Sequence, residues 1–303
     1  MNQSISTSSH ASIIRAPKLD IREQVASLDD LPMIPEMALR ILELQDDADA
    51  TVDQLASIIQ MDPALSAQLI RYANSPLYGQ RSSVDTLEDA IFRVLGFETV
   101  LYIALGSTLS QAFHLPRSGP IGLKTFWQNA VFSAALVQKL ASQHQRQWQI
   151  KPGTAYLCAL LHNIGYLVLA TLFESEYFWL NKVIEARPDT AVVEIEKQLL
   201  GISHTELGKY LLESWHLPKE IVTVASEHHN LGYEGKHSDT VRLIQVTDQL
   251  LRSHKMSDAD TDEISTGLCQ KLGLDDSEIY LAMDDVLESS SVLNSMAKSF
   301  SNT

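Results

Sequence analysis

Apolar residues recur every three or four positions along most of this chain, which is the spacing of one face of an α-helix. Leu65, Leu69 and Tyr72 show this spacing after Asp62. The same spacing recurs in the segments 98–113, 126–144, 174–186, 190–200, 203–215 and 240–254. No segment has the strict alternation of a β-strand or the turn of a hairpin. The pattern predicts an all-α protein.

Residues that begin and end helices agree with this pattern. Thr51 followed three residues later by Gln54 is a capping box, in which two side chains satisfy backbone N–H groups at a helix start. Asp62–Pro63 supplies an N-cap and a proline at the first helical position. Gly96 follows an apolar segment as a C-cap would. These signals predict several short helices separated by tight turns.

A stretch rich in proline and glycine, HLPRSGPIG at residues 114–122, divides the chain. Such a composition is typical of a loop. Both ends are polar and rich in serine, so we expect them to be loose or only marginally helical. The predicted divisions are a flexible segment 1–22, a domain 23–225 with an N-terminal lobe 23–117 and a second lobe 118–225, C-terminal helices 226–287 that complete the second lobe, and a Ser-rich tail 288–303.

Composition and charge restrict the class of function. The 45% hydrophobic and 20% charged fractions are those of an ordinary globular protein. A net charge of −15 without a Lys/Arg run argues against direct binding to nucleic acid or to an anionic membrane. No secretion signal begins the chain, and its apolar runs fall short of the roughly 18 residues that span a bilayer. Cys158 and Cys269 form no CxxC motif, as expected of free thiols in a reducing cytoplasm.

The segment ALLHNIGYLVLA, residues 159–170, places a histidine and an asparagine in an almost wholly apolar helix. A helix that is apolar all round is buried, and a buried polar group without a partner costs about 2–7 kcal/mol. His162 therefore needs a partner. Asp248 is the natural one, because it lies on the apolar face of its own helix and a buried carboxylate is rare unless it is paired or bound to metal.

Three further histidines could face the same place. His204 falls in the first turn of its helix, where backbone N–H groups are unpaired. His228 and His229 close another helix, where a protonated imidazole suits the helix dipole. With His162 and Asp248 they allow two interpretations, a hydrogen-bonded polar core or a metal centre. The three could also line a cleft that binds an anion or a nucleotide.

Several motifs together resemble the HDOD family, a helical signalling domain related to the HD phosphohydrolases. They are DPALSAQLIRYANSPLYG (62–79), the later LG (95–96), FWQNAVFSAALVQKLA (126–141), AYLCALLHNIGYLVLA (155–170) and GISHTELGKYLLESWHLPKEIVTVASEHHN (201–230). The resemblance covers roughly residues 24–250. It implies a two-lobed helical HDOD fold whose second lobe is similar to HD phosphohydrolases.

In catalytic HD enzymes, metal is held by an early His, a His–Asp pair and a later Asp. Aligned by motif, the resemblance places Asn129 at the early His, His162–Asn163 at the pair and Asp248 at the later Asp. Hydrolysis there needs a cation that binds phosphate and activates water, but an amide brings no charge and is a weaker ligand than a carboxylate. We therefore expect a degenerate site with no catalytic residue, no metal and no other cofactor. His162 and Asp248 would remain as a structural contact.

The resemblance implies a non-enzymatic regulatory protein that binds other signalling proteins in bacterial two-component or cyclic-di-GMP networks. The residues outside the resemblance are too few for a receiver, kinase or cyclase domain, so separate partners are expected, and a homodimer is allowed. The alternative is a metal-dependent phosphohydrolase or phosphodiesterase acting on a nucleotide or cyclic dinucleotide. Its Fe, Mn or Zn would be held by His162, His204, His228 and Asp248. A third hypothesis is a ligand sensor that keeps the cleft without the chemistry.

Overall fold

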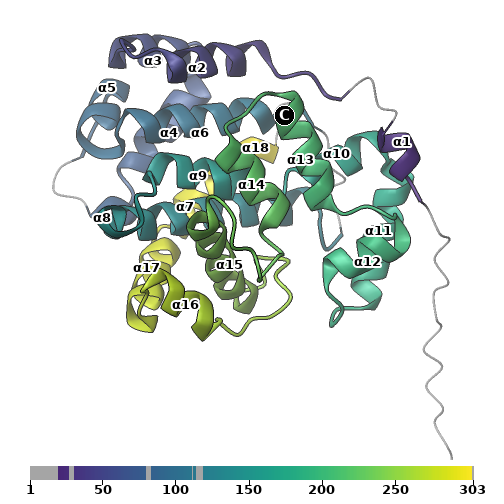
Figure 1. Ribbon diagram of the computed structural model, residues 1–303. Helices are drawn as coiled ribbons and strands as arrows, with labels where there is room; N and C mark the ends of the chain where they lie inside the picture. The colour runs from purple at the N-terminus through teal and green to yellow at the C-terminus, as the bar shows by residue number, and fades with distance from the viewer. Residues whose placement is uncertain (1–19, 27–30, 80–82, 111, 114–118, 302–303) are drawn as a thin grey trace, which may run out of the picture.

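The computed structural model describes residues 20–26, 31–79, 83–110, 112–113 and 119–301. Every regular element among these residues is helical, so the all-α prediction is confirmed (Figure 1). The elements are α1 (Arg22–Ala26), α2 (Glu36–Asp46), α3 (Val52–Ile59), α4 (Pro63–Ala73), the 3-10 turn η1 (Pro76–Tyr78), α5 (Leu87–Asp89), the π-helical turn η2 (Ala90–Leu95), α6 (Phe97–Ser110), α7 (Leu123–Gln143), α8 (Gln145–Trp148), α9 (Pro152–Leu161), α10 (Gly165–Leu172), α11 (Glu174–Ala186), α12 (Val192–Leu199), α13 (His204–Ser214), α14 (Lys219–Glu227), α15 (Ser238–Ser253), α16 (Thr266–Leu272), α17 (Asp276–Glu288) and α18 (Ser290–Ser301).

The predicted helix starts form the expected bonds. The Thr51 hydroxyl accepts from the Gln54 backbone N–H, and the Gln54 side chain accepts from the Thr51 N–H. The Asp62 carboxylate accepts from the first backbone N–H groups of α4, which begins at Pro63. The N-terminal boundaries of α3 and α4 are therefore local properties of the sequence.

The N-terminal lobe, α2 to α6, lies at the top of Figure 1 and shares one core with the second lobe. Its α6 is buried nearly all round and packs against α2 on its own side and α9 of the second lobe. A Cβ at Gly106 would lie 2.0 Å from the Leu160 side chain. Glycine at this position therefore lets α6 and α9 approach closely.

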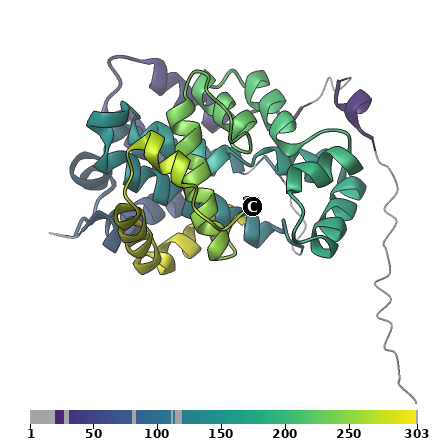
Figure 2. The same ribbon diagram turned by 60° about the horizontal axis from the view of Figure 1, so that its bottom comes forward.

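The second lobe surrounds the candidate site. In it α7 contacts α9 and α15, while α14 contacts α9, α13 and α15. The pair α11 and α12 lies together at one side of the molecule in both ribbon views (Figures 1 and 2). From α12 this pair supplies Glu196, a fully buried carboxylate that faces the site.

The apolar segment expected to be one helix is in fact two, so that prediction was wrong. α9 ends at Leu161, residues 162–164 form a turn, and α10 begins at Gly165. A Cβ at Gly165 would lie 1.8 Å from the His204 carbonyl oxygen, so α10 begins in direct backbone contact with the first turn of α13. His162 therefore occupies the C-cap of α9 instead of a helix interior.

The C-terminal segment, expected to be a Ser-rich tail that is loose or only marginally helical, forms α18, which packs on α7, α4 and α6. Leu293, Met296 and Phe300 are buried on one face, whereas Ser291 and Ser295 face solvent. The helix is more firmly packed than the composition indicated, because the serines cover only the outer face of an amphipathic helix.

The structure describes only part of the predicted N-terminal segment and of the predicted linker. Residues 1–19 of the predicted N-terminal segment and residues 114–118 of the predicted linker lie outside the described residues. Ile21, inside the segment expected to be flexible, is buried, and its N–H donates to the Leu200 carbonyl at 2.9 Å. Ile21 is therefore already packed against the second lobe.

One candidate membrane span arises by length and composition when residues 152–172 are taken through the turn as one helix. Of its most apolar window, 89% is buried inside the protein. A second candidate exists only if the two helices that meet at Gly96, bent by 120°, are counted together. A buried core helix of a soluble protein meets the same criteria, so this is weak evidence for a membrane.

Candidate functional site

The structure brings together the four positions that the resemblance assigned to metal. Asn129 comes from α7, His162 and Asn163 from the turn after α9, and Asp248 from α15. None of these four residues is more than 6% exposed. The Nε2 atom of His162 lies 3.5 Å from Oδ2 of Asp248, so the expected contact between them is present.

His162 and Asp248 face each other without a hydrogen bond between them. Nδ1 of His162 lies 2.6 Å from the Ala159 carbonyl oxygen and donates to it, so Nε2 presents a lone pair to the carboxylate unless a second proton is bound. Burial raises the pKa of Asp248 to about 6, against the opposing effect of His162. Among the described residues, His162 Nε2, Asn163 Oδ1 and Asp248 Oδ1 are buried without a hydrogen-bond partner.

The two amides use their N–H groups to join the elements around them. Nδ2 of Asn129 donates to the Met256 carbonyl at 2.5 Å. Nδ2 of Asn163 lies 3.5 Å from Asn129 Oδ1 and 3.3 Å from Asp258 Oδ1. The amide oxygens could ligate a cation, and the buried Oδ1 of Asn163 has no hydrogen-bond partner among the described residues, but an amide is neutral and a weaker ligand than a carboxylate, and only one of the four positions can carry negative charge. These positions therefore do not fit the divalent ion of an HD phosphohydrolase.

Asp258, in the loop between α15 and α16, is a site residue that sequence reasoning missed. Its Oδ2 accepts from the Tyr166 hydroxyl at 2.8 Å, and Asn163 Nδ2 lies 3.3 Å from its Oδ1. Oδ2 also lies 3.6 Å from His229 Nε2 and 4.0 Å from His204 Nε2. Burial disfavours the charged carboxylate, but His229 and the neighbouring histidines hold the pKa of Asp258 well below its usual range.

No sequence signal distinguishes Asp258 from its neighbours. It lies in MSDADTDE, residues 256–263, where four acidic residues look like an ordinary solvated loop. Loop residues have no periodic pattern that could indicate which side chain points inward. Only the fold of this loop against α10 and α14 makes Asp258 different from Asp260, which is exposed.

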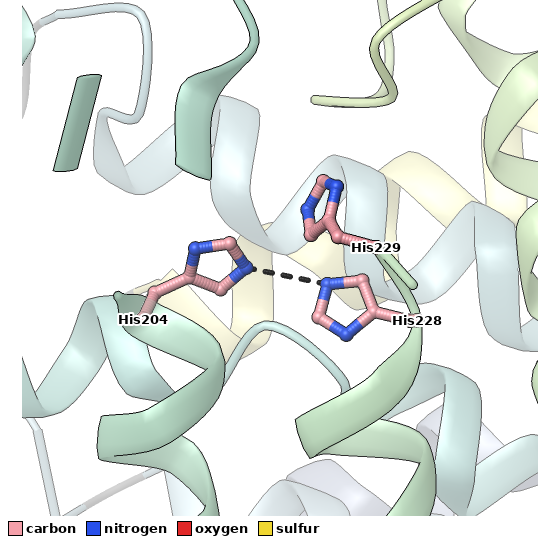
Figure 3. A group of neighbouring side chains, drawn as sticks. All are labelled: His204, His228 and His229. Carbon is pink, nitrogen blue, oxygen red and sulfur yellow. Dashed lines mark hydrogen bonds between the residues drawn. The ribbon is translucent and has the colours of Figure 1, made fainter. Parts of the chain in front are cut away.

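His204, His228 and His229 converge beside Asp258 from the ends of two helices (Figure 3). Their ligand nitrogens lie within 4.8 Å of one another, and Nε2 of His204 is 3.2 Å from Nε2 of His228. Nδ1 of His204 lies 2.9 Å from both carboxylate oxygens of Glu196. Nδ1 of His228 lies 3.1 Å from the Ala225 carbonyl oxygen.

These contacts fix the electrostatics of the cluster. Because Nδ1 of His204 and Nδ1 of His228 each face an acceptor, their Nε2 lone pairs point at each other. Two lone pairs at 3.2 Å repel unless a proton or a cation lies between them. Burial and the adjacent histidines lower the pKa of His228 well below its usual value. Burial also opposes charge on His229, but Asp258 raises the pKa of His229 to about 9.

The ligand set of the alternative enzyme hypothesis is contiguous. His162 and His228 lie with ring centroids 4.9 Å apart, which connects the His162–Asp248 pair to the His204–His228 pair. The four residues of that hypothesis are therefore neighbours in the structure. The structure separates them into an inner half with the two amides and an outer half with three histidines.

The cavities beside the site are small. One of about 50 Å³ is lined by Pro120, Ile121, Thr125, Phe126, Asn129, Asn163, Tyr166, Ser257 and Asp258. Another, of about 30 Å³, is lined by His228, His229, Leu231, Gln245, Asp248, Gln249, Ala259, Asp260 and Thr261. Sites for drug-sized ligands usually measure about 300–1,000 Å³. A third cavity, of about 90 Å³, also reaches Asp258. In this conformation all three are large enough for waters or an ion and smaller than a nucleotide needs, which does not favour the hypothesis that the three histidines line a nucleotide cleft.

Comparison with known proteins places this geometry in a family. The model of the HDOD domain matches residues 31–231. An uncharacterized protein of Treponema pallidum (strain Nichols) is 25% identical over 206 residues, covering 67% of this chain and 38% of that protein. A crystal structure from Marinobacter aquaeolei VT8, whose name assigns it provisionally to signal transduction, is 30% identical with a TM-score of 0.76. That match covers 94% of this chain and 62% of the other.

Both relatives are therefore substantially longer than the part that this chain matches. An HDOD domain protein of unknown function from Geobacter sulfurreducens is 22% identical, with a TM-score of 0.70 over 92% of this chain and 96% of that chain. At this identity the likeness shows the fold alone. Asp248 and Asp258 both lie beyond residue 231, where the family match ends. Since that match spans most of the chain and the two-lobed helical fold agrees with it, this chain belongs to the HDOD family.

Proposed function

We propose that this chain is a non-enzymatic HDOD protein that works in signalling by binding other proteins. Membership of the family and the likeness to the Marinobacter protein support a role connected with signal transduction. The observation that carries the non-enzymatic part is the pair of amides, Asn129 and Asn163. Their N–H groups donate to the Met256 carbonyl and to the Asp258 carboxylate.

Two physical requirements of metal-assisted hydrolysis are missing from the inner half of the site. The intact HD set holds its cation with two carboxylates, which strengthen binding of the ion, but Asp248 is the one carboxylate among the four inner positions and its pKa is raised to about 6. A phosphate would also have to approach the partly exposed Asp258 carboxylate, which already accepts from the hydroxyl of Tyr166 and faces the amide of Asn163. The phosphate and the Asp258 carboxylate are both negative, so they would repel each other.

An exposed apolar surface on the N-terminal lobe would serve binding to another protein. Met61 is 61% exposed and Phe92 is 82% exposed. The side chains of Gln60 and Glu88 are hydrogen-bonded at 2.9 Å, and Phe92 lies one helical turn after Glu88. This places Met61 and Phe92 on neighbouring elements of one lobe. Exposed aromatic and methionine side chains are enriched where proteins bind one another.

Hydrolase assays of the purified chain test the enzymatic half of the proposal. The chain is loaded with Fe²⁺, Mn²⁺ or Zn²⁺ and assayed on bis(p-nitrophenyl) phosphate, cyclic-di-GMP and nucleoside monophosphates. We expect no turnover above that of the metal alone, in the wild type and in Asp248→Asn. Turnover by the wild type that is lost in Asp248→Asn would establish the alternative, a phosphohydrolase using His162, His204, His228 and Asp248.

Quantitative binding tests the other half. Partners captured from cells by the full chain are purified and titrated against wild type, Phe92→Ser and an exposed control, Tyr280→Ser on α17. We expect saturable binding that Phe92→Ser weakens at least tenfold and Tyr280→Ser leaves unchanged. Absence of any partner with saturable binding contradicts the proposal.

A further inference from the structure

We propose that His204, His228, His229 and Asp258 bind one transition-metal cation of the zinc class, in a closed site that ties the loop after α15 to α13 and α14. This inference does not depend on the proposed protein-binding role. It also leaves aside the inner positions, Asn129, His162, Asn163 and Asp248, whose ligands do not fit a metal.

The spacing of the ligand atoms carries the proposal. In a tetrahedral site with metal–nitrogen distances near 2.1 Å, neighbouring ligand atoms are about 3.4 Å apart. Here Nε2 of His204 and Nε2 of His228 are 3.2 Å apart. Oδ2 of Asp258 lies 3.6 Å from Nε2 of His229 and 4.0 Å from Nε2 of His204. One ring nitrogen from each of the three histidines lies within 4.8 Å of the other two (Figure 3).

The hydrogen bonds behind the ligands have the orientation that metal sites use. A ligating histidine usually donates its other N–H to a carboxylate or carbonyl, which fixes the ring and its tautomer. The Glu196 carboxylate accepts a hydrogen bond from Nδ1 of His204, and the Ala225 carbonyl accepts one from Nδ1 of His228. Both rings therefore present Nε2 lone pairs to the same point. The Tyr166 hydroxyl holds the Asp258 carboxylate in place.

Unsatisfied atoms and charge agree with a cation at this point. Among the described residues, the buried Nε2 of His229 has no hydrogen-bond partner, although an Asp258 oxygen is 3.6 Å away. The carboxylates of Asp258, 17% exposed, and of Glu196, fully buried, both face the histidine cluster and would attract a cation there. Three imidazoles and one carboxylate suit zinc, cobalt, nickel or iron, whereas magnesium and calcium prefer oxygen ligands.

The fourth ligand determines what such a metal can do. A catalytic zinc keeps one position open for water, whereas a structural zinc is closed by four protein ligands. Asp258 takes the fourth position and comes from a loop beyond the region that the HDOD family model matches. The metal would therefore stabilise the loop of residues 254–265 and perform no hydrolysis.

The test uses the full chain, stripped of metal with EDTA and titrated with Zn²⁺ and, in parallel, Co²⁺. We expect one equivalent to bind with micromolar or tighter affinity and to raise the melting temperature. The Co²⁺ complex should show the intense visible absorption of a tetrahedral ion. Elemental analysis after gel filtration gives the stoichiometry independently of any activity.

Variants locate the ion. Asp258→Asn and His204→Gln should each weaken Zn²⁺ binding at least tenfold, whereas Asp260→Asn, in the same loop, should not. Asp248→Asn should also retain binding, which separates the outer site from the inner one. Far-ultraviolet circular dichroism checks that each variant is folded, and the Co²⁺ spectrum of the wild type reports the ligand set without any variant. Binding that survives Asp258→Asn and is lost in Asp248→Asn overturns the assignment, as does no binding at micromolar concentration.

Metal and hydrolysis are separable outcomes. A bound ion without turnover supports this inference and leaves the proposed function standing. Turnover overturns the proposed function, and the Co²⁺ spectrum together with the Asp258→Asn and Asp248→Asn variants would still show which of the two sites holds the ion.

Discussion

The Tyr166 hydroxyl donates to the Asp258 carboxylate at 2.8 Å, and this bond joins α10 to the loop between α15 and α16. Tyr166 is buried, and its ring stacks on His204 with centroids 4.1 Å apart. One side chain of the HNIGY segment thus positions both a histidine and a carboxylate of the outer site.

Tyr166→Phe should destabilise the protein by about 1.5–3 kcal/mol, the usual range for a hydrogen bond to a charged group. The change removes only the hydroxyl, so the stacking on His204 remains. The measurement is the free energy of unfolding in urea at pH 7 with EDTA present. Tyr233→Phe is the matched control, because its hydroxyl donates to the Lys236 carbonyl at the surface. Equal losses in the two variants would contradict a special role for Tyr166.

His229 should make stability depend on pH between about 6.5 and 9. Its pKa is raised from 6.5 to about 9 in the folded protein. The stabilisation is therefore complete below pH 6.5 and is lost as the pH rises through 9, with an upper limit of about 3 kcal/mol. Urea unfolding in EDTA from pH 6 to pH 9.5 measures it.

His229→Gln should flatten that profile, because glutamine does not titrate. His254→Gln is the control, since His254 is exposed at the end of α15. A profile in His229→Gln that falls as steeply as in the wild type would show that other groups cause the dependence.

Asp248→Asn should stabilise the protein at pH 7. The pKa of Asp248 is raised from 3.8 to about 6 by burial, so the folded state loses stability as the pH rises from about 4 through 6. An asparagine removes this cost and can donate to the lone pair on His162 Nε2. We expect a gain of roughly 1–3 kcal/mol at pH 7.

The gain should disappear near pH 4, where Asp248 is protonated in the folded state. This makes the same variant its own control. A loss of stability at pH 7 would instead show that the ionised carboxylate of Asp248 has a favourable partner, as the alternative metal-dependent hypothesis requires.

Gly165→Ala should disturb the outer site as well as the fold. Its Cβ would lie 1.8 Å from the His204 carbonyl oxygen, a backbone atom that cannot rotate away. We expect a loss of about 1–3 kcal/mol or more and weaker Zn²⁺ binding. Gly267→Ala on α16 is the control, because the nearest atom to its Cβ would be 3.8 Å away. That helical substitution should be neutral or stabilising, and similar losses in both variants would contradict the packing argument.

Features with a local cause could be predicted from the sequence. The capping box at Thr51 and the N-cap at Asp62 form as expected. Each depends on side chains within three residues of one another, so no tertiary contact is needed to choose the conformation. The approach of His162 and Asp248 could also be predicted, because a buried polar group must find a partner.

Features set by distant contacts could not be predicted. The helix break after Leu161 depends on backbone contact between Gly165 and His204. The helical C-terminus depends on a surface of α7, where the Phe300 ring lies 5.3 Å from that of Trp127. In both places the local composition favours another conformation, and the gain from packing decides.

By itself the sequence determined that this chain is helical, where several helices begin, which family it belongs to and which polar residues are buried together. Only the tertiary structure decided that the amides join neighbouring elements, that three histidines form a separate outer cluster and that Asp258 completes it. The physical reason is range. Periodicity and capping act over a few residues, whereas the direction in which a loop carboxylate points is set by hydrogen-bond donors more than 25 residues away in the chain.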